Sequence, residues 1–416
     1  MRDYVDGEEF SESKDAINMA LIDCTDPESF EVAVKSSKWR QAMDAEINSI
    51  VKNGIWELTD LPAGAKKIGV KWIYKTKLNE IGQVDKYKAR LVAKGYSQEQ
   101  GVDYIEVFAP VSKMDIVRMI IAIAASRGWK LYQLDVKSAF LYGTLNEDVY
   151  VEQPKGYVQK GCENKVYKLY KALYGLKQAP RAWFNRIESY FMSAGFRKSN
   201  HEQTLFLKHT LDERVLIVSL YVDDLIYTSN DESLMSAFKN SMKKEFDMTD
   251  LGRMRFFLGI EVLQEDDGIY IYQRKYALEV LRRFGMSDSN FFKVPIVPGC
   301  KLSKDETGMK VDETRYKQLV GSLMYITATR LNLMFSVSLI SRFMSQPTQI
   351  HMQVAKRVLR YLQGTVDFGI FYKKGGDEEL LAYTNSDYAG ELVDRKSTSG
   401  YVFLLSNGAV AWSSKK

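Results

Sequence analysis

The chain has 416 residues, of which 45% are hydrophobic and 27% are charged, the balance of a globular protein with a large core. Its three cysteines are too scattered for a disulfide framework, and its three histidines lack cysteine neighbours at zinc-site spacing, which argues against a zinc site and against histidine-based catalysis. The net charge of +5 favours an anionic partner only mildly, and no membrane partner is expected because no apolar run is long enough to span a bilayer.

The N-terminal segment predicts a lead-in followed by a helix. Residues 1–28 contain nine acidic residues and two basic ones with little periodicity, so we expect a flexible acidic lead-in. A helix is expected after Pro27 and should end at Gly54. Its apolar residues at helical spacing are Trp39, Met43, Ile47 and Ile50.

Strands and a buried helix are predicted next along the chain. Residues 72–77 and 87–93 predict paired strands around a turn that contains Gly82. A buried helix is expected over residues 112–125. Residues 129–136, rich in Leu, Tyr and Trp, predict a strand that ends in a turn or a helix start.

The second half predicts one more helix, two hairpins and a helical region. Residues 174–195 predict an amphipathic helix after a glycine turn. Residues 253–263 and 268–272 predict a hairpin, and residues 312–364 are expected to be helical. Near the C-terminus, strand alternation around Asn407-Gly408 predicts another hairpin.

The most informative stretch is Val215–Thr228, an apolar run that contains Asp223 and Asp224. Its β-branched and aromatic bias predicts two short strands folded back at the acidic pair. Two negative charges beside apolar strands are costly unless something positive neutralises them, and a hard divalent cation with oxygen ligands would do so. A plain turn is the alternative, because Asp is a favoured turn residue.

A third acid, Asp135, lies at the end of the strand predicted over residues 129–136. If this strand and the Asp223–Asp224 hairpin are neighbours in one sheet, the three carboxylates can hold two Mg²⁺ ions ~3.5–4 Å apart, the arrangement used for in-line phosphoryl transfer. Taken alone, Asp135 is better explained as a cap or a salt-bridge partner. Taken together, the three acids predict a catalytic metal site.

Basic residues are concentrated in two runs that flank the proposed metal site in the sequence. Residues 66–94 contain nine Lys or Arg and two acids, and residues 164–187 contain six Lys or Arg and no acid, with five aromatic residues interleaved. Basic groups mixed with aromatics suit phosphate contacts and base stacking, so the runs favour nucleic-acid binding. A solvated face over an apolar core is the alternative for each run.

These residues also carry a resemblance to a known family. Tyr221-Val-Asp-Asp224 resembles the signature of reverse transcriptases, and an ordered series of neighbours resembles the copia-type branch of retrotransposon polymerases. The series consists of Lys86–Gly95, Leu134–Phe140, Leu173–Trp183, Phe257–Val262, Arg315–Tyr325 and Asp394–Tyr401. A four-residue signature alone would be weak support, whereas this ordered series is specific and spans nearly the whole chain after residue 28.

The resemblance implies a fold. It is an α+β right-hand polymerase of fingers, palm and thumb, followed by a truncated RNase H-like α/β tail. The fingers and palm would comprise residues 29–270, a helical thumb or connection residues 271–372, and the partial RNase H-like domain residues 373–416.

The resemblance also implies an activity, that of an RNA-directed DNA polymerase. Asp135, Asp223 and Asp224 would bind two Mg²⁺, or Mn²⁺ as a substitute, while a primer 3′-OH attacks the α-phosphate of a dNTP. The implied partners are an RNA or DNA template with its primer, and the dNTP. The implied location is intracellular, in a cytoplasmic particle or in the nucleus.

Further site residues follow from the same resemblance. The incoming nucleotide would be bound by Lys77, Arg90, Phe140, Tyr174, Gly175 and Lys177, and the primer by Leu258, Gly259 and Glu261. Phe140 would lie under the sugar and exclude a ribose 2′-OH, the alternative being an ordinary core Phe. Lys77 and Arg90 would neutralise the triphosphate, although other lysines of the same strands are close enough in sequence to take these roles.

The sequence departs from the family pattern in two places. Asn385 stands where the family has its first RNase H carboxylate, and the chain ends at Lys416 before the later acids, so nuclease activity is not expected. Arg330-Leu-Asn332 stands where Pro-Asp usually follows the Arg. These departures leave a second function open, that of a catalytically inactive retrotransposon remnant that at most binds nucleic acid, although retention of all three palm acids favours the enzyme.

Overall fold

The computed structural model of the protein describes residues 26–78, 83–300, 302–376, 378–390 and 395–416. Most of the predicted acidic lead-in and the predicted turn at Gly82 lie outside the described residues. The chain divides into two units. Unit 1 comprises Met1–Ser112, Leu134–Leu225 and Ser236–Asp250, and unit 2 comprises Lys113–Gln133, Ile226–Met235 and Leu251–Lys416.

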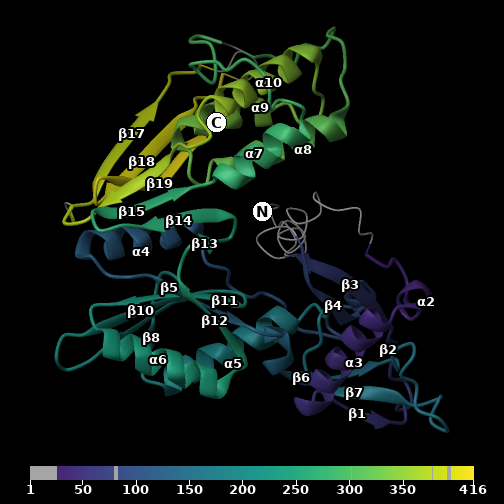
Figure 1. Ribbon diagram of the computed structural model, residues 1–416. Helices are drawn as coiled ribbons and strands as arrows, with labels where there is room; N and C mark the ends of the chain where they lie inside the picture. The colour runs from purple at the N-terminus through teal and green to yellow at the C-terminus, as the bar shows by residue number, and fades with distance from the viewer. Residues whose placement is uncertain (1–25, 79–82, 301, 377, 391–394) are drawn as a thin grey trace. The chain divides into compact units, whose positions relative to one another are not determined.

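Unit 1 begins with a helix packed on a strand pair. After the short α2 (Phe30–Ala33), α3 (Ser37–Lys52) packs on the hairpin of β3 (Val70–Leu78) and β4 (Val84–Ala93) (Figure 1). The Trp39 ring meets Tyr74 edge-on, with 5.4 Å between the ring centroids, because both rings are buried between the helix and the hairpin. The predicted paired strands are confirmed, and the predicted helix is confirmed over Ser37–Lys52, with a break between α2 and α3.

A four-stranded sheet supports this helix and hairpin. Its order is β1 (Trp56–Thr59), β7 (Val166–Lys171), β6 (Thr144–Val151) and β2 (Lys67–Ile68). The pairs are antiparallel except β2 with β6. The short helix η1 (Gly95–Ser97) follows β4.

A six-stranded sheet carries the acids singled out in the sequence. Its order is β12 (Met248–Arg253), β5 (Tyr132–Val136), β11 (Asp224–Ser229), β10 (Val215–Tyr221), β9 (Leu205–His209) and β8 (Arg197–Lys198). Helices α5 (Ala179–Ser193) and α6 (Glu232–Glu245) lie along one face (Figure 1). The predicted strand before Val136 and the hairpin at the acidic pair are confirmed.

Helix α5 begins five residues later than predicted. Residues 174–178 form a turn, and Pro180 lies in the first turn of the helix, where its missing N–H costs nothing. Its buried face packs on the sheet through aromatic rings, with 4.7 Å between the centroids of Phe191 and Phe206.

Unit 2 contains helix α4 (Met114–Arg127), which confirms the predicted buried helix and packs against β15, β16 and β19. An antiparallel sheet has the order β13 (Phe256–Phe257), β14 (Ile260–Gln264), β15 (Gly268–Tyr272) and β16 (Gly369–Lys373). The pairing of β14 with β15 confirms the predicted hairpin.

The helical region of unit 2 is confirmed as three helices between Asp312 and Gly364. They are α8 (Glu313–Ile326), α9 (Met334–Ser341) and α10 (Gln349–Gln363), with the short η3 (Leu331–Leu333) before α9. Together with α7 (Arg274–Arg283) they enclose a buried apolar cluster (Figure 1). In the described part of the chain, no helix combines the length and the apolar character needed to cross a membrane.

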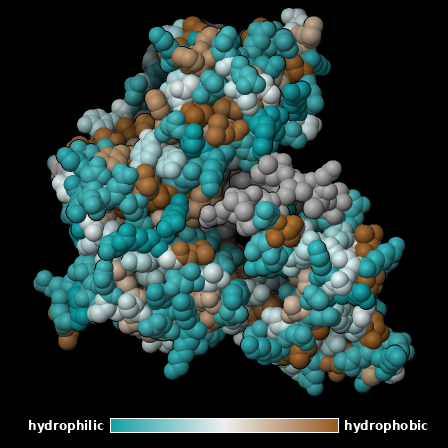
Figure 2. All heavy atoms as spheres, viewed as in Figure 1, coloured by the Kyte–Doolittle hydropathy of each residue, from teal (hydrophilic) through white to brown (hydrophobic). Residues whose placement is uncertain are grey.

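The C-terminal strands form an antiparallel sheet in the order β17 (Leu381–Ser386), β18 (Ser399–Leu405) and β19 (Gly408–Lys415). Ser406 and Asn407 form the turn between the last two strands, with φ of 52° and 64°, so the turn lies one residue earlier than predicted. The buried Arg118 of α4 donates to the Val410 carbonyl (2.7 Å) and lies over the Trp412 ring, which ties β19 to α4. Hydrophilic residues cover most of the surface visible in Figure 2.

The departure at Asn332 is accommodated by hydrogen bonds to a buried arginine. The Arg330 side chain donates to Asn332 Oδ1 (3.2 Å) and to the backbone and side-chain oxygens of Thr365 (2.7 Å each). Asn332 Nδ2 in turn donates to the Tyr361 hydroxyl (2.7 Å). Burial lowers the pKa of Arg330, and these acceptors within the described chain are all neutral.

A carboxylate at position 332 should therefore stabilise unit 2. We expect Asn332→Asp to raise the free energy of unfolding at pH 7 by about 1 kcal/mol, because a charged acceptor strengthens the bond to the guanidinium. Asn332→Ala, which removes both hydrogen bonds, should lower it by about 1–3 kcal/mol. Urea unfolding at pH 7 and pH 3 tests this: the gain from Asp must disappear at pH 3, and an Asp variant no more stable than wild type at pH 7 would contradict the account.

Candidate active site

The acid-bearing ends of β5 and the β10–β11 hairpin lie side by side in unit 1. The backbone N–H of Val136 donates to the backbone oxygen of Asp223, with 2.8 Å between the two atoms. This bond joins the residue after Asp135 to the hairpin, and it meets the condition on which the three-carboxylate prediction depended, that the strands be neighbours in one sheet.

The hairpin turn gives the two adjacent acids different surroundings. Val222 and Asp223 form the turn, and Val222 has a φ of 56°, in the left-handed region. Asp223 is half-buried, whereas Asp224 begins β11 and is 5% exposed. The turn interpretation of the acidic pair is thus correct for Asp223, and it coexists with a position beside Asp135.

The donor set suits a hard divalent cation, but it is not preassembled. Carboxylate oxygens are the ligands that Mg²⁺ takes in proteins. Among the described residues, no three Asp, Glu, His or Cys side chains are gathered closely enough to form a ready-made metal site. The sheet therefore fixes the backbones that carry the three acids, while their side chains do not converge as a closed cage would.

Three of the predicted nucleotide-binding residues form one cluster around the Tyr174 ring. The Arg90 guanidinium lies 4.5 Å from the centroid of the Tyr174 ring. The centroid of the Phe140 ring lies 5.1 Å from the same point. Phe140 belongs to the short helix η2 (Ala139–Tyr142), which directly follows β5. Burial raises the pKa of the Tyr174 hydroxyl to about 12, with the nearby Asp223 carboxylate adding to the rise and Arg90 opposing it. The cluster therefore lies near the acidic turn.

Arg90 belongs to a row of cations on one face of the β3–β4 hairpin. Residues directly opposite each other in an antiparallel pair point to the same face. The register pairs Lys75 with Lys88 and Lys77 with Lys86, and it places Arg90 two residues beyond Lys88 on the same face. Among the described residues, Arg90 Nε is buried without a hydrogen-bond partner.

The glycine at position 175 is required by close packing. The backbone N–H of Ala93 donates to the Tyr174 oxygen (2.7 Å), and a Cβ on Gly175 would overlap the Ala93 oxygen. Gly175 also has a φ of 86°, which side chains rarely adopt. Lys177 is exposed, and its ammonium contacts the Tyr104 hydroxyl (3.4 Å). Nucleotide contacts by Gly175 and Lys177 stay predictions.

The second basic run is largely paired within unit 1. Its ion pairs are Lys165–Asp60 (3.8 Å), Lys168–Asp148 (2.7 Å), Arg181–Glu106 (3.5 Å) and Arg186–Glu245. The acids come from other segments, so the run that lacks acids in sequence is balanced in space. Phosphate contacts by either basic run stay predictions.

The predicted primer contacts lie in unit 2. Leu258 and Gly259, with φ of 48° and 73°, form the turn between β13 and β14, and the Tyr325 hydroxyl donates to the Leu258 oxygen. Glu261 accepts a hydrogen bond from the Lys275 backbone (2.7 Å). Their contact with a primer stays a prediction.

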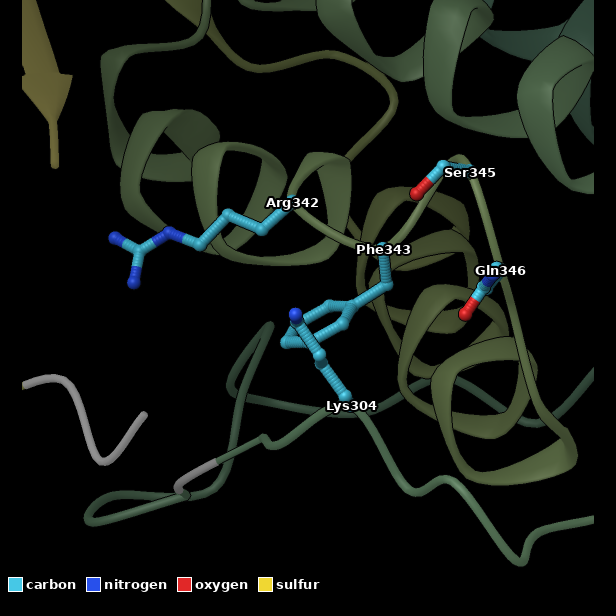
Figure 3. Close-up of a pocket in the computed structure, with 5 residues that line it drawn as sticks. All are labelled: Lys304, Arg342, Phe343, Ser345 and Gln346. Carbon is cyan, nitrogen blue, oxygen red and sulfur yellow. The ribbon is translucent and has the colours of Figure 1, made fainter. Parts of the chain in front are cut away.

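A pocket of about 200 Å³ lies elsewhere in unit 2 (Figure 3). It is lined by Lys304, Arg342, Phe343, Ser345 and Gln346, and Arg342 points away from the Phe343 ring. None of the residues predicted for catalysis or nucleotide binding lines it.

Two residues near the site were given no role of their own by the sequence analysis. Glu46 of α3 is buried beneath β4 and accepts from the Leu91 N–H (3.3 Å), and burial raises the pKa of its carboxyl. The signal that could have found Glu46 is its position within the apolar stripe of α3. Trp183 of α5 donates through its indole N–H to the Val222 oxygen (2.6 Å), a long-range contact that no sequence pattern indicates.

Comparison with known proteins identifies the class. The family described as "Reverse transcriptase (RNA-dependent DNA polymerase)" matches residues 53–298, which is more than half of the chain. The chain belongs to the reverse transcriptase family. The mixed α and β architecture agrees with this family, whereas the division into fingers, palm, thumb and RNase H-like tail stays a prediction.

Its relatives are retrotransposon Pol polyproteins, in agreement with the copia-type motifs. The chain is 40% identical over 404 residues to the Retrovirus-related Pol polyprotein from transposon RE1 of Arabidopsis thaliana, covering 97% of this chain and 28% of the relative. It is 38% identical over 407 residues to that from transposon TNT 1-94 of Nicotiana tabacum, covering 95% of this chain and 31% of the relative. A putative transposon Ty5-1 protein of Saccharomyces cerevisiae is 34% identical, over 68% of this chain and 92% of the relative. The chain thus spans less than a third of the plant polyproteins.

The crowded cation row predicts a pH dependence of stability. Burial, with repulsion from Arg90 and Lys77, lowers the pKa of Lys88 to about 8. Because the folded pKa lies below the unfolded one, the folded state bears the cost of a buried charge at neutral pH and loses that cost as pH rises through 8. We expect Lys88→Met to raise the free energy of unfolding at pH 7 by about 1–3 kcal/mol, with the gain shrinking toward pH 10.

Urea unfolding of wild type and variant at pH 7 and pH 9.5 measures this difference. Lys71→Met, at an exposed position of the same hairpin, serves as the control and should show no such pH dependence. A Lys88→Met advantage that is equal at both pH values would contradict a lowered pKa.

Proposed function

We propose that the chain is an RNA-directed DNA polymerase that transfers a nucleotide from a dNTP to a primer 3′-OH. In this reaction the 3′-oxygen forms a bond to the α-phosphorus and pyrophosphate leaves. The observation that carries the proposal is the hydrogen bond between Val136 and Asp223, because it joins two acid-bearing strand ends that the sequence separates widely. Membership of the reverse transcriptase family supports the same reaction class.

Asp135, Asp223 and Asp224 are the residues that would hold Mg²⁺ or Mn²⁺. Two such ions, when bound, lower the cost of the negative charge that develops on the attacking and leaving oxygens. The protein's own contribution is to present three carboxylates from two neighbouring strands of a rigid sheet, so that little reorganisation is needed beyond side-chain rotation.

The cation row of the β3–β4 hairpin supports a role in binding the triphosphate. Arg90 offers a fork of donors on the same face as Lys88, and such a fork suits phosphate oxygens. Lys77 lies on the same face and would add positive charge. The Tyr174 and Phe140 rings next to Arg90 give the sugar and base an apolar surface.

A template with its primer, and a dNTP, are the partners that this activity requires. Because such an enzyme copies an element's RNA, we extend the proposal to a location in a cytoplasmic particle or in the nucleus. Fluorescent tagging of the chain in cells tests the location. The alternative function, a catalytically inactive remnant, predicts nucleic-acid binding without extension.

Primer extension tests the proposed reaction directly. Purified wild-type chain should extend a DNA primer on an RNA template with Mg²⁺ or Mn²⁺. We expect Asp223→Asn and Asp135→Asn each to reduce the rate by on the order of 10³-fold or more, because a ligand charge is lost at nearly constant volume. Thermal unfolding should remain close to that of wild type, and Asp224→Asn should have a smaller effect.

Asp148→Asn provides the matched control. It makes the same substitution at an exposed acid of unit 1 that pairs with Lys168, and extension should remain unchanged. A wild-type chain that binds primer–template but never extends it would establish the remnant instead. Extension by Asp223→Asn at the wild-type rate would refute the site assignment.

The Phe140 ring predicts discrimination between sugars. Its position beside Tyr174 and after the Asp135 strand supports a collision with a ribose 2′-OH. We expect Phe140→Val to raise kcat/KM for an rNTP relative to the matching dNTP by about 10-fold or more. Single-nucleotide incorporation with both substrates measures the ratio, and an unchanged ratio would assign Phe140 to the core alone.

A further inference from the structure

The indole of Trp183 links the hairpin turn to the segment that follows Asp135. Trp183 lies on α5 and is 1% exposed, and the hydrogen-bond partner of its indole N–H lies outside the helix. It donates to the Val222 oxygen, with 2.6 Å between the two atoms. Val222 is the turn residue directly before Asp223.

The turn that accepts this bond adopts an unfavourable conformation. Val222 has a φ of 56°, and the left-handed region is costly for a β-branched residue. Such a conformation persists when surrounding contacts over-determine it, and these conformations gather at functional sites. The bond from Trp183 holds the carbonyl on one side of the turn, and the bond from Val136 holds the Asp223 carbonyl on the other.

The ring of Trp183 packs against two aromatic residues that lead back to the segment after Asp135. Its centroid lies 6.1 Å from that of Tyr142 and 5.5 Å from that of Phe246. The Tyr142 hydroxyl accepts from the Asp247 N–H (2.8 Å), and the Asp247 oxygen accepts from the Lys137 N–H (2.9 Å). Lys137 is two residues after Asp135, so a continuous set of contacts runs from one acid-bearing segment to the other.

Close backbone packing keeps the indole at this place. A Cβ on Gly143 would lie 2.6 Å from the backbone carbon of Ala182 and from the backbone nitrogen of Trp183, so α5 and the end of η2 touch through their main chains. A shift of the helix away from the turn would therefore have to displace η2 as well. The donor that holds the turn cannot move independently of the segment after β5.

We propose that Trp183 is a positioning residue for nucleotidyl transfer. Its N–H holds the left-handed turn that carries Asp223, and its ring holds the segment behind Asp135, so one side chain sets how the two carboxylates face each other. It touches no substrate. The proposal rests on the proposed polymerase activity for its kinetic consequence, but its structural content, a turn held by an indole, can be measured without catalysis.

Trp183→Phe is the test, because it removes the N–H and keeps an aromatic ring. We expect kcat for primer extension to fall by about 10–100-fold, as for a misplacement of reacting groups by roughly 1 Å, while KM for dNTP changes less than twofold. Amide hydrogen exchange of the peptide that spans residues 216–228 should become faster in the variant. A purely structural defect would instead lower the unfolding temperature without separating kcat from KM.

Trp56→Phe is the matched control, since Trp56 also lies in unit 1 but stacks on Tyr167 of the neighbouring strand β7. It should leave both kcat and the exchange of residues 216–228 unchanged. Adding Val222→Gly to Trp183→Phe should restore part of kcat, because glycine adopts a positive φ without the cost of a Cβ.

The outcomes separate the two proposals. Wild-type kcat and wild-type exchange in Trp183→Phe would overturn the positioning role. An inactive wild-type chain would overturn the polymerase proposal, and the exchange of residues 216–228 would then still decide whether Trp183 holds the turn.

Discussion

One backbone hydrogen bond, from Val136 to Asp223, constrains the whole candidate site. Neighbouring strands in a sheet lie about 4.8 Å apart, so the ladder brings the carriers of like charges together whatever those charges prefer. Sheet formation and burial of the apolar strands supply the free energy that brings the acid-bearing residues together. The fold thus fixes the backbone positions of the residues that carry the three carboxylates.

The β3–β4 hairpin brings positive charges together. Directly opposed lysines, Lys75 with Lys88 and Lys77 with Lys86, destabilise a strand pair. The other face offsets this cost, since Tyr74 and Tyr87 pack against Trp39 of α3. A hairpin held from behind by aromatic packing can keep a cation row in front. Sequence rules broken in this way are expected at functional sites.

The parts of the site that local patterns determine were predictable, and the rest required long-range contacts. The hairpin at Asp223 and the strand before Val136 follow from short apolar runs, so the sequence indicated both. It did not indicate that they are neighbours, and the predicted metal site was conditional on that. The run over residues 164–187 seemed free of acids because its partners, among them Asp60 and Glu245, come from distant segments. The bond from Trp183 to Val222 depends on how α5 packs, which no periodicity encodes.

The two asparagines that depart from the family pattern separate structural from catalytic uses of a carboxylate. Asn332 keeps an acceptor for Arg330 and adds a donor for Tyr361, so an amide can preserve the geometry of a structural contact. Asn385 lies in the exposed strand β17, opposite Gly400, where an amide fits the sheet equally well. What an amide cannot supply is the charge that binds a metal ion. The fold accommodates an amide at both positions, and the polymerase proposal depends on the charges retained at Asp135, Asp223 and Asp224.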